Sequence, residues 1–377
     1  MAKYKLGDIV TLLNGRAYLM PELQDSGKYR ILRVGNLSGG NDSWYYSDME
    51  LDENKYCENG DLLYAWACNF GPHIWREEKV IYHYHIWKLV ENKEKVDRTY
   101  LYYYLLHQTP FYLGGVNGAT MVHITKKNME KKTVYIPSSL NVQHRIASIL
   151  STYDSLIENN TKRIRLLEKM AENIYKEWFV RFRFPGHENV EMENGLPKGW
   201  KRGSLSDVCE FKRGKNITSS EMQEGNVPVI SAGLEPSGYH SCSNVRGVNV
   251  TMSSSGANAG YIAIHYSDIW AADCSYIEES TTGNIYYVYE LLNNIRTVIN
   301  NFQRGAAQPH VYPKDVNRIK LILPSENLMQ KANARLEMMH KEIHNLQHQN
   351  SLLARQRDLL LPRLMSGKLE VKEELLE

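Results

Sequence analysis

The sequence has few cysteines, and none of them is spaced as a metal-binding or redox pair. Five cysteines occur in 377 residues, without any C-x-x-C motif. Because their number is odd, they cannot all be joined in disulfides within one chain. We therefore expect reduced thiols and a cytoplasmic protein. The cysteines are Cys57, Cys68, Cys209, Cys242 and Cys274.

Long apolar runs and a strong net charge are also missing. No stretch approaches the roughly 18 consecutive apolar residues that a membrane span needs, and the N-terminus MAKYKLGDIV has no apolar signal segment. The formal net charge is only +2, which excludes a strongly basic protein that wraps nucleic acid but allows local basic surfaces. We expect a soluble protein that does not bind a membrane.

The motifs of common catalytic sites are not found either. The sequence has no P-loop, dinucleotide-binding glycine motif, G-x-S-x-G elbow or H-E-x-x-H, and no Asn or Asp followed by Pro-Pro and an aromatic residue. His83 and His85, in a strand expected over 80–90, come nearest to a metal pair, but no third ligand stands at a suitable spacing. We interpret both histidines as structural and expect a protein without catalytic residues or a metal.

What the sequence does contain is a long internal repeat. Residues 118–138, GATMVHITKKNMEKKTVYIPS, return 187 positions later as GAAQPHVYPKDVNRIKLILPS. Two weaker matches precede them in the same order, 6–17 with 205–216 and 61–71 with 250–260. Solenoid units are roughly 20 to 50 residues long, so this repeat is a whole domain and a helix, duplicated once. The matched pairs include Gly15/Gly214, Asn69/Asn258, Gly71/Gly260, Gly118/Gly305 and His123/His310.

The repeat predicts two similar modules. The first module, 1–138, and the second module, 201–324, are rich in short strand-like runs separated by Gly, Asn and Asp. Each has one helical stretch, 97–108 or 284–302, and a linker rich in Gly and Pro, 185–200, lies between the halves. We predict an α+β fold with two mixed, mostly β domains related by a pseudo-twofold internal repeat.

Two long helices follow the modules, over 139–184 and 325–377. In both, apolar residues alternate spacings of four and three, the periodicity of a coiled coil. Each apolar stripe needs a partner, so we predict that the helices form an antiparallel coiled coil. Pro185 and Gly186 should end the first helix, and Pro362 should limit the second. The predicted seam comprises Ile146, Leu150, Tyr153, Ile157, Asn160, Ile164, Leu167, Ile174, Leu336, Met339, Ile343, Leu346, Asn350, Leu353 and Leu360. Asn160 and Asn350 either fix the register of the pair or occupy tolerated edge positions.

The order of these parts resembles the specificity (S) subunit of type I restriction-modification systems, over essentially the whole chain. The resemblance rests on Gly118, 123–137, Gln143 and the helix LLEKMAENIYKEWFVRFRFPG, then on LPKGWKRGSLSDVCEFKRGK, 305–324, Gln330 and the closing QRDLLLPRLMSGKLEV. It implies that each module is a target recognition domain for one half of a bipartite double-stranded DNA sequence. It also implies that the helices space these domains and dock two modification subunits.

The resemblance further implies that catalysis belongs to partner subunits. The modification subunits would bind S-adenosylmethionine and methylate adenine, and a motor-nuclease subunit that uses ATP and Mg would join them for cleavage. This chain would need no cofactor of its own.

Candidate DNA contacts are polar side chains in loops that glycines mark, because backbone can approach a groove closely there. We predict contacts from Arg16, Asn69, His73, Arg76, Asn117, Thr120, His123, Lys126 and Lys127 in the first module. In the second module the candidates are Lys212, Arg213, Lys215, Ser254, Ser255, Asn258, Arg304, Gln308, His310 and Lys314. The residues shared between modules have an alternative role in turn geometry, since modules that read different sequences should differ at base-reading positions.

Three other functions remain open at this point. The chain could serve a restriction system in which one chain combines nuclease and methyltransferase, and the partner recovered from its host would show this. It could instead be a coiled-coil scaffold with two ligand-binding modules that do not bind DNA. A stand-alone enzyme is the last alternative, testable by assaying the chain alone.

Overall fold

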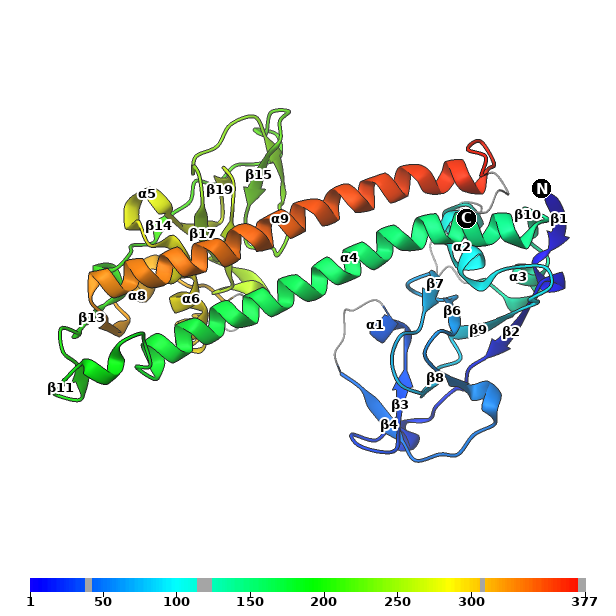
Figure 1. The fold of residues 1–377 in the computed structure, drawn as a ribbon, viewed down its shortest axis with the longest axis horizontal. Coiled ribbons are helices and arrows are strands. Elements are labelled where there is room, and N and C mark those ends of the chain that lie inside the picture. Colours follow the sequence, from blue (N-terminus) through cyan, green and yellow to red (C-terminus); the bar gives the residue numbers. More distant parts are fainter. Residues whose placement is uncertain (38–42, 114–123, 306–308, 372–377) are drawn as a thin grey trace. The chain divides into compact units, whose positions relative to one another are not determined.

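The chain forms two compact units in a computed structural model that describes residues 1–37, 43–113, 124–305 and 309–371. One unit is Met1–Glu158 with Asn350–Glu377, and the other is Asn159–Gln349. Each unit contains one strand-rich module and a part of each of the two long helices (Figure 1). In the described part of the chain, no helix has the length and apolar character that crossing a membrane requires.

The first module is built from small sheets. The sheets β2-β9-β6-β7 and β4-β3-β8-β5 are built from strands that are interleaved along the chain, and β1 pairs with β10. Val10 and Leu12 are buried while Thr11 between them is exposed, which is the alternation of a strand with one face on the core. The elements are β1 Ala2–Lys5, β2 Val10–Asn14, β3 Tyr29–Leu32, α1 Val34–Leu37, β4 Tyr45–Ser47, β5 Tyr56–Cys57, β6 Leu62–Ala65, β7 Gly71–Ile74, β8 Val80–Tyr82, β9 Ile86–Glu91, α2 Arg98–Leu113, α3 Lys126–Glu130 and β10 Thr133–Ile136.

The second module repeats this topology. Its sheets have the orders β14-β20-β17-β18, β16-β15-β19 and β13-β21, and only β5 has no counterpart among the described strands. The internal repeat of the sequence is therefore a repeat of structure. The elements are β13 Lys201–Ser204, β14 Lys212–Arg213, β15 Val227–Ile230, β16 Gly238–His240, β17 Asn249–Ser253, β18 Ile262–His265, β19 Trp270–Ala271, β20 Cys274–Glu278, α5 Glu279–Thr282, α6 Ile285–Asn294, α7 Arg296–Asn300, α8 Pro313–Val316 and β21 Lys320–Leu323.

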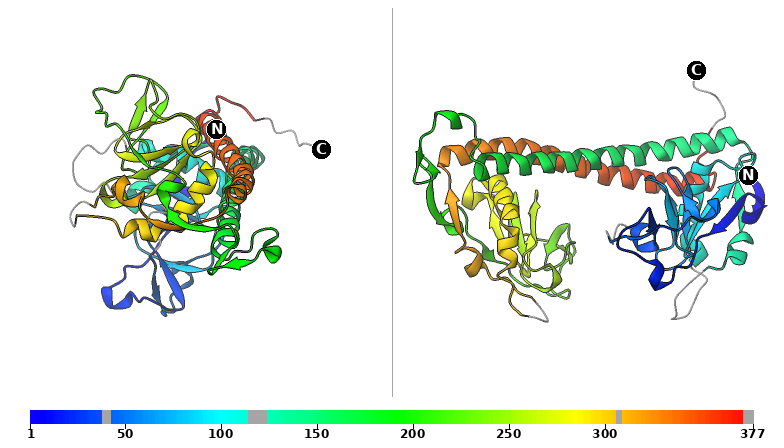
Figure 2. Two further views of the ribbon diagram at one scale, coloured as in Figure 1. Left: turned by 90° about the vertical axis from the view of Figure 1, so that its left-hand side faces the viewer. Right: turned by 90° about the horizontal axis from the view of Figure 1, so that it is seen from below.

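The two long helices are α4, Leu140–Tyr175, and α9, Glu326–Met365. In the first unit Asp154 of α4 pairs with Arg357 of α9, and in the second unit Arg163 of α4 lies 2.7 Å from Glu342 of α9. Residue numbers rise along one helix as they fall along the other, so the helices run antiparallel in both units (Figures 1 and 2). The predicted antiparallel pair is confirmed.

The apolar stripes of the helices also complete the cores of the modules. Ile146 and Leu150 of α4 pack in one cluster with Tyr100 of α2 and with Leu361 and Leu364 of α9. In the second unit Ala171 and Tyr175 of α4 join α6 and Leu336 of α9 in another cluster. A smaller cluster of Ile164, Leu167, Ile343 and Leu346 belongs to the two helices alone. Part of the predicted seam is therefore shared between helix and module, a role that the periodicity alone does not reveal. The shared seam residues are Ile146, Leu150, Ile174, Leu336, Met339 and Leu360.

Asn160 contacts a residue of the other long helix. Its side chain is buried, and its amide nitrogen donates to Oε1 of Gln349 at 3.4 Å. A buried amide that finds its partner on the other helix favours one register of the pair. This contact supports the first of the two roles considered for Asn160.

Several predicted boundaries differ from the structure. The stretch 284–302 is not one helix, because Ile295 leaves helical geometry between α6 and α7. The expected strand over 80–90 is interrupted at 83–85, between β8 and β9. Proline 362 does not end α9, which continues to Met365, and Gly367 at φ +72° follows the helix. Residues 366–371 lie outside the helix predicted over 325–377.

The first helix and the linker also contain local structure. After Tyr175, α4 continues as one wider π-helical turn, Lys176–Val180, and the chain leaves it through Phe182 at φ +58°. The predicted linker holds a small hairpin of β11, Met192–Glu193, and β12, Leu196–Pro197. Its turn residues are Asn194 and Gly195, both with positive φ, the geometry of a tight two-residue hairpin turn.

Candidate nucleic-acid interface

Three loop segments that we predict to contact DNA meet at one edge of the second module. The amide of Lys215 donates to the carbonyl of Ala271 at 2.9 Å, and the amide of Val311 donates to the carbonyl of Ser254 at 3.0 Å. Arg304 and His310 exchange backbone hydrogen bonds of 2.9 and 2.8 Å. We call this region, formed by 212–215, 254–258, 272–273, 304–305 and 309–310, the second edge.

The first module has the equivalent edge. The amide of Arg16 donates to the carbonyl of Tyr82 at 3.0 Å, as Lys215 does to Ala271, and the amide of Ile124 lies 3.5 Å from the carbonyl of Trp66, as Val311 does from Ser254. We call 14–16, 66–69, 83–85 and 124–127 the first edge. The predicted contacts Asn117, Thr120, His123 and Gln308 lie outside the described residues.

The side chains at these edges differ in exposure. Asn69, Lys127, Lys212, Arg213, Lys215, Arg304 and Lys314 are exposed, whereas Arg16, Lys126, Asn258 and His310 are intermediate. Ser254 and Ser255 are buried, and the Ser255 hydroxyl donates to Oδ2 of Asp273 at 2.5 Å. The exposed residues include five lysines and arginines of the second module, and Lys and Arg are residues that commonly contact phosphates. The two buried serines hydrogen-bond within the module, Ser255 to Asp273 and Ser254 to Ser275, and so stabilise the second edge.

Three of the predicted arginines form ion pairs with carboxylates. Arg16 donates to both oxygens of Glu22, at 2.9 and 2.6 Å, and this hydrogen bonding raises the pKa of Arg16 and lowers the pKa of Glu22. Arg213 lies 2.8 Å from Oδ1 of Asp273, and Arg304 lies 2.8 Å from Oδ2 of Asp315. Arg16 and Arg213 hydrogen-bond to their carboxylates, and such a pair fixes a guanidinium in one geometry and leaves its other N–H groups available.

Two predicted contacts do not join the first edge. Arg76 extends toward α4, where its Nη1 lies 3.4 Å from Oε2 of Glu158. His73 stands within β7, opposite Leu63 of β6, and burial lowers its pKa. The structure therefore separates both residues from Arg16 and Trp66.

Two glycines shared by the modules have a structural reason. A Cβ atom on Gly15 would lie 2.4 Å from the carbonyl oxygens of Tyr82 and His83, and one on Gly214 would lie 2.4 Å from the carbonyl oxygen of Ala272. Only glycine allows the chain to approach the neighbouring turn this closely. The repeat of Gly15 as Gly214 thus reflects packing at each edge.

Two acidic or aromatic residues at the edges were not among the predicted contacts. Asp273 lies at the centre of the second edge, between Arg213 and Ser255. Tyr84, which is 39% exposed, occupies the matching turn of the first edge. The sequence holds a weak signal of them. The repeat offset falls from 189 for 61–71 to 187 for 118–138, so the modules differ in length somewhere between these segments.

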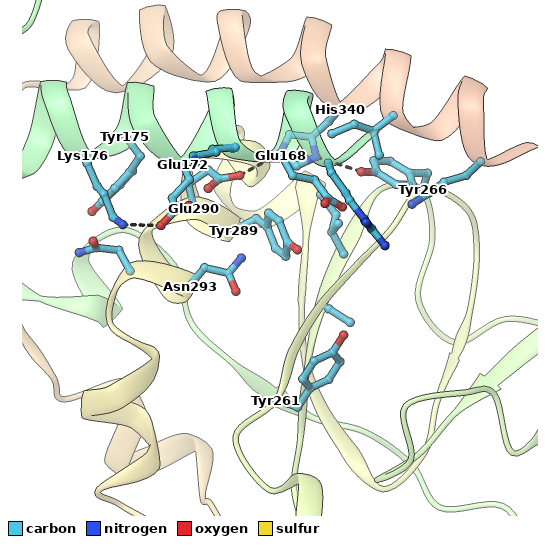
Figure 3. A pocket seen from close by; sticks show the side chains of 17 residues that line it. Glu168, Glu172, Tyr175, Lys176, Tyr261, Tyr266, Tyr289, Glu290, Asn293 and His340 are labelled. Carbon is cyan, nitrogen blue, oxygen red and sulfur yellow. Dashed lines mark hydrogen bonds and ion pairs between the residues drawn. The ribbon is translucent and has the colours of Figure 1, made fainter. Parts of the chain in front are cut away.

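A separate cavity of about 900 Å³ lies in the second unit, between the helix pair and the second module. Figure 3 shows Glu168 and Glu172 of α4, Glu290 and Asn293 of α6 and His340 of α9 around it. Burial raises the pKa of Glu168. None of the predicted DNA contacts among the described residues lines this cavity.

A buried polar junction crosses one wall of the cavity. Nε2 of His340 lies 3.2 Å from Oε1 of Glu290, and the Tyr266 hydroxyl lies 2.9 Å from Nδ1 of His340 (Figure 3). Glu290 of α6 corresponds through the repeat to Tyr103 of α2, which donates to Asp154 of α4 in the first unit. In each unit, therefore, a polar contact joins the module's helix to a long helix; this contact is buried in the second unit and partly buried in the first.

The described residues contain no group of three or more His, Cys, Asp or Glu side chains arranged to hold a metal ion. Cys57, Cys209 and Cys274 are buried, and burial raises the pKa of each thiol. Cys68 and Cys242 are exposed.

Comparison with known proteins gives one family. The family model described as "Type I restriction modification DNA specificity domain" matches 1–169 and 197–354. The type I restriction enzyme MjaIX specificity subunit of Methanocaldococcus jannaschii is 26% identical over 307 residues, which cover 74% of this chain and 71% of that protein. The MjaVIII specificity subunit of the same organism is 27% identical over 230 residues, 60% of this chain and 53% of that protein.

A solved structure shares the fold. The crystal structure of a type I restriction-modification system S subunit from M. genitalium has a TM-score of 0.65 and 19% identity, and the alignment covers 96% of this chain and 95% of that one. The family model matches twice, once over each module and the long helix after it. The chain therefore belongs to the family of type I restriction-modification DNA specificity subunits.

Proposed function

We propose that each module reads one half of a bipartite double-stranded DNA target. The observation that carries this proposal is the pair of equivalent edges, which have the same backbone hydrogen bonds but different side chains. Direct readout needs side-chain donors and acceptors that reach base edges. One fold with two different edges would supply two different half-sites.

The long helices would set the spacing between the half-sites. The 36 residues of α4 span about 54 Å at roughly 1.5 Å per residue. One turn of B-DNA is about 34 to 36 Å long, so helices of this length could keep two recognition domains more than a turn apart. The polar pair Asn160 and Gln349 would help to keep the register, and hence the spacer, constant.

The helix pair would also dock two modification subunits. On the face away from the module clusters, the first unit exposes Ile149, Leu156, Leu352 and Leu359 at 39 to 56%. In the second unit Leu166, Met170 and Met338 are exposed at 51 to 68%. Exposed apolar groups that recur on one helix face are typical of a protein interface. One such group in each unit fits two partners of the same kind.

The location of Arg163 and Glu342 supports the assignment of this face. In the heptad pattern both residues flank the seam on one side, and their salt bridge of 2.7 Å closes the seam there. Ile149, Leu156 and Met170 occupy the same heptad position as Arg163. On the opposite side of the seam, Ala147 and Tyr175 are buried in the cores of the modules.

Chemistry would reside in the partners. We propose that the chain has no catalytic residues, that modification subunits supply S-adenosylmethionine-dependent adenine methylation, and that motor-nuclease subunits with ATP and Mg supply cleavage. The second edge fits this division, because the Ser255 hydroxyl and the Arg213 guanidinium both donate to Asp273 and so pair with one another.

The test is base-resolved mapping of DNA methylation in cells that produce this chain with its modification subunit. We expect methylated adenine in a two-part motif with a spacer of constant length. An unmethylated genome, with both proteins soluble and associated, would contradict the proposal. Loss of all methylation on removal of this chain alone would show that the modification subunit depends on it for recognition.

A further inference from the structure

The turn 83–85 is the most exposed aromatic feature of the first edge. Tyr84 is 39% exposed, whereas the following Ile86 and Trp87 are buried. Its ring centroid lies 4.0 Å from that of His85 and 4.5 Å from that of His83. The ring of Trp66 lies 5.1 Å from that of His85 and 5.7 Å from that of buried Trp87. A continuous set of rings therefore joins the exposed turn to the core.

Hydrogen bonds hold the backbone of this turn on both sides. The amide of Tyr84 donates to the carbonyl of Arg16 at 3.0 Å, and the carbonyl of Tyr84 accepts from the Trp66 indole at 2.8 Å. The amide of His83 donates to the carbonyl of Leu32 at 2.9 Å. Such a turn presents Tyr84 in one place, as a recognition residue requires.

The second module has the same turn with other residues. The amide of Ala272 donates to the carbonyl of Ile230 at 2.8 Å, as His83 does to Leu32. Gly214 donates to the carbonyl of Cys274, as Gly15 does to Ile86. Three residues, 83–85, thus occupy the place that Ala272 and Asp273 take in the second module. The first turn is one residue longer and aromatic, and the second is acidic.

Asp273 organises the side chains around it. Its Oδ1 lies 2.8 Å from Nη2 of Arg213, and its Oδ2 accepts from the Ser255 hydroxyl at 2.5 Å. Arg213 remains 45% exposed at its side chain. In the first module the positions matching Arg213 and Ser255 are Asn14 and Ala67, which cannot form this arrangement.

Because base-reading positions must differ between modules that read different half-sites, we infer that these two turns carry specificity-determining residues. Tyr84 with His85 would contact bases in the first half-site. Arg213 would contact the second half-site, with Asp273 as its positioning residue. The inference rests on the proposed function of the modules as readers of DNA.

The chemistry of the turns suggests what each would recognise. Burial lowers the pKa of His83 to about 4 and lowers the pKa of His85, so both rings are neutral near pH 7 and each has one donor and one acceptor nitrogen. Nδ1 of His83 already accepts from the amide of His85 at 3.4 Å, which leaves its Nε2–H as a donor. An exposed phenol ring beside them suits contact with a thymine methyl or a base face. A guanidinium held by a carboxylate suits the O6 and N7 acceptors of guanine.

The experiment uses the complex of the full chain with its modification subunit and two DNA libraries, each with one half-site randomised. The bound DNA is sequenced for the wild type, Tyr84→Ala and Asp273→Asn. Tyr135→Ala is the matched control, because Tyr135 is a 51% exposed tyrosine of β10 in the first module. Recovery of the modification subunit with each variant reports folding.

Tyr84→Ala should lower discrimination at one or two positions of the first half-site by about 5-fold to 150-fold, the range for loss of one good base contact. Asp273→Asn should do the same only in the second half-site, and Tyr135→Ala should change neither. Unchanged selection by both variants, or equal changes in both half-sites, would overturn the inference. If the wild-type complex selects no two-part sequence, the proposed function itself fails.

If Asp273→Asn prevents assembly, Arg213→Lys gives a second test. Lysine keeps the charge but lacks the planar fork that reads guanine. We expect Arg213→Lys to assemble and to lose preference at one position of the second half-site. Retention of the full preference would overturn the role assigned to Arg213 and Asp273.

Discussion

Substitution of His340 by alanine should loosen the second module from the helix pair. His340 is 2% exposed and connects Tyr266 of the module and Glu290 of α6 to α9. In the neutral form, Nε2–H donates to the carboxylate of Glu290 and Nδ1 accepts from the hydroxyl of Tyr266. Alanine removes both hydrogen bonds and leaves Glu290, itself buried, without this partner.

The size of the effect follows from these contacts. A hydrogen bond to a charged group contributes about 1.5 to 3 kcal/mol, and a neutral one about 1 kcal/mol. The His340 ring also packs against Tyr286 and Tyr289, with centroids 5.3 and 5.4 Å away. In the His340→Ala variant, water in the adjacent cavity would solvate part of the Glu290 carboxylate that the substitution uncovers, which reduces the loss of stability. We therefore expect His340→Ala to lower the free energy of unfolding of the second unit by about 3 kcal/mol.

The assay is urea unfolding of the full chain together with hydrogen exchange of peptides that cover α6. Protection of 285–294 should fall in His340→Ala and change little in Glu290→Gln, because glutamine retains an acceptor oxygen. His348→Ala, at an exposed position of the same helix, is the matched control. A loss below about 1 kcal/mol, with unchanged protection of α6, would refute the view that this junction fastens the module.

Other predictions concern the edges and the helices. Gly15→Ala should destabilise the first unit by more than about 2 kcal/mol, because its Cβ would meet the His83 carbonyl at 2.4 Å; thermal unfolding within 1 °C of the wild type would contradict this. Burial lowers the pKa of His265 to about 4, so the unfolded chain binds more protons between pH 4 and about 6.5. The second unit should lose up to about 3 kcal/mol as the pH falls through that window, and His265→Gln should flatten the pH dependence if this histidine causes it. Deletion of one heptad from each helix, 157–163 and 346–352, removes about 10 Å of helix. This deletion should shorten the spacer by about three base pairs without changing the half-sites. An unchanged spacer length in the methylated motif would contradict the role of the helices.

The arrangement of modules and long helices could be predicted because the sequence contains a regular helical spacing and an internal repeat. The alternating spacing of four and three predicts α4 and α9, and buried Leu150 and Ile343 lie where the stripe places them. The repeat predicts two modules of one topology, and the sheet orders confirm it. These features depend on many residues, so single irregularities do not conceal them.

Local interruptions could not be predicted in the same way. The run 80–90 has the composition of one strand, but the hydrogen bonds of the turn at Tyr84 come from Arg16 and Trp66, which are distant in sequence. Tertiary context decides such a turn, and no local propensity reports it. Sequence proximity groups the predicted contacts Arg76 and His73 with Asn69, whereas His73 lies within β7 opposite Leu63 and Arg76 pairs with Glu158 of α4.

The buried polar contact between Glu290 and His340 could not be predicted from the sequence either. Glu290 and His340 are 50 residues apart, and neither occupies a position that the helical pattern marks as buried. Glutamate in a helix is ordinarily a solvent-exposed residue, so the junction becomes visible only once α6 and α9 are packed together. The exposure of each predicted base-reading residue depends on such packing as well.

Replacement of the second module by a copy of the first tests the central claim most directly. The registers Ala2↔Ile136 and Lys201↔Leu323 give matched junctions, so 2–136 can be inserted in place of 201–323. The methylated motif of this chain with its modification subunit is then read base by base. Independent reading by the modules predicts two copies of the first half-site in inverted orientation, and persistence of the original second half-site would contradict it.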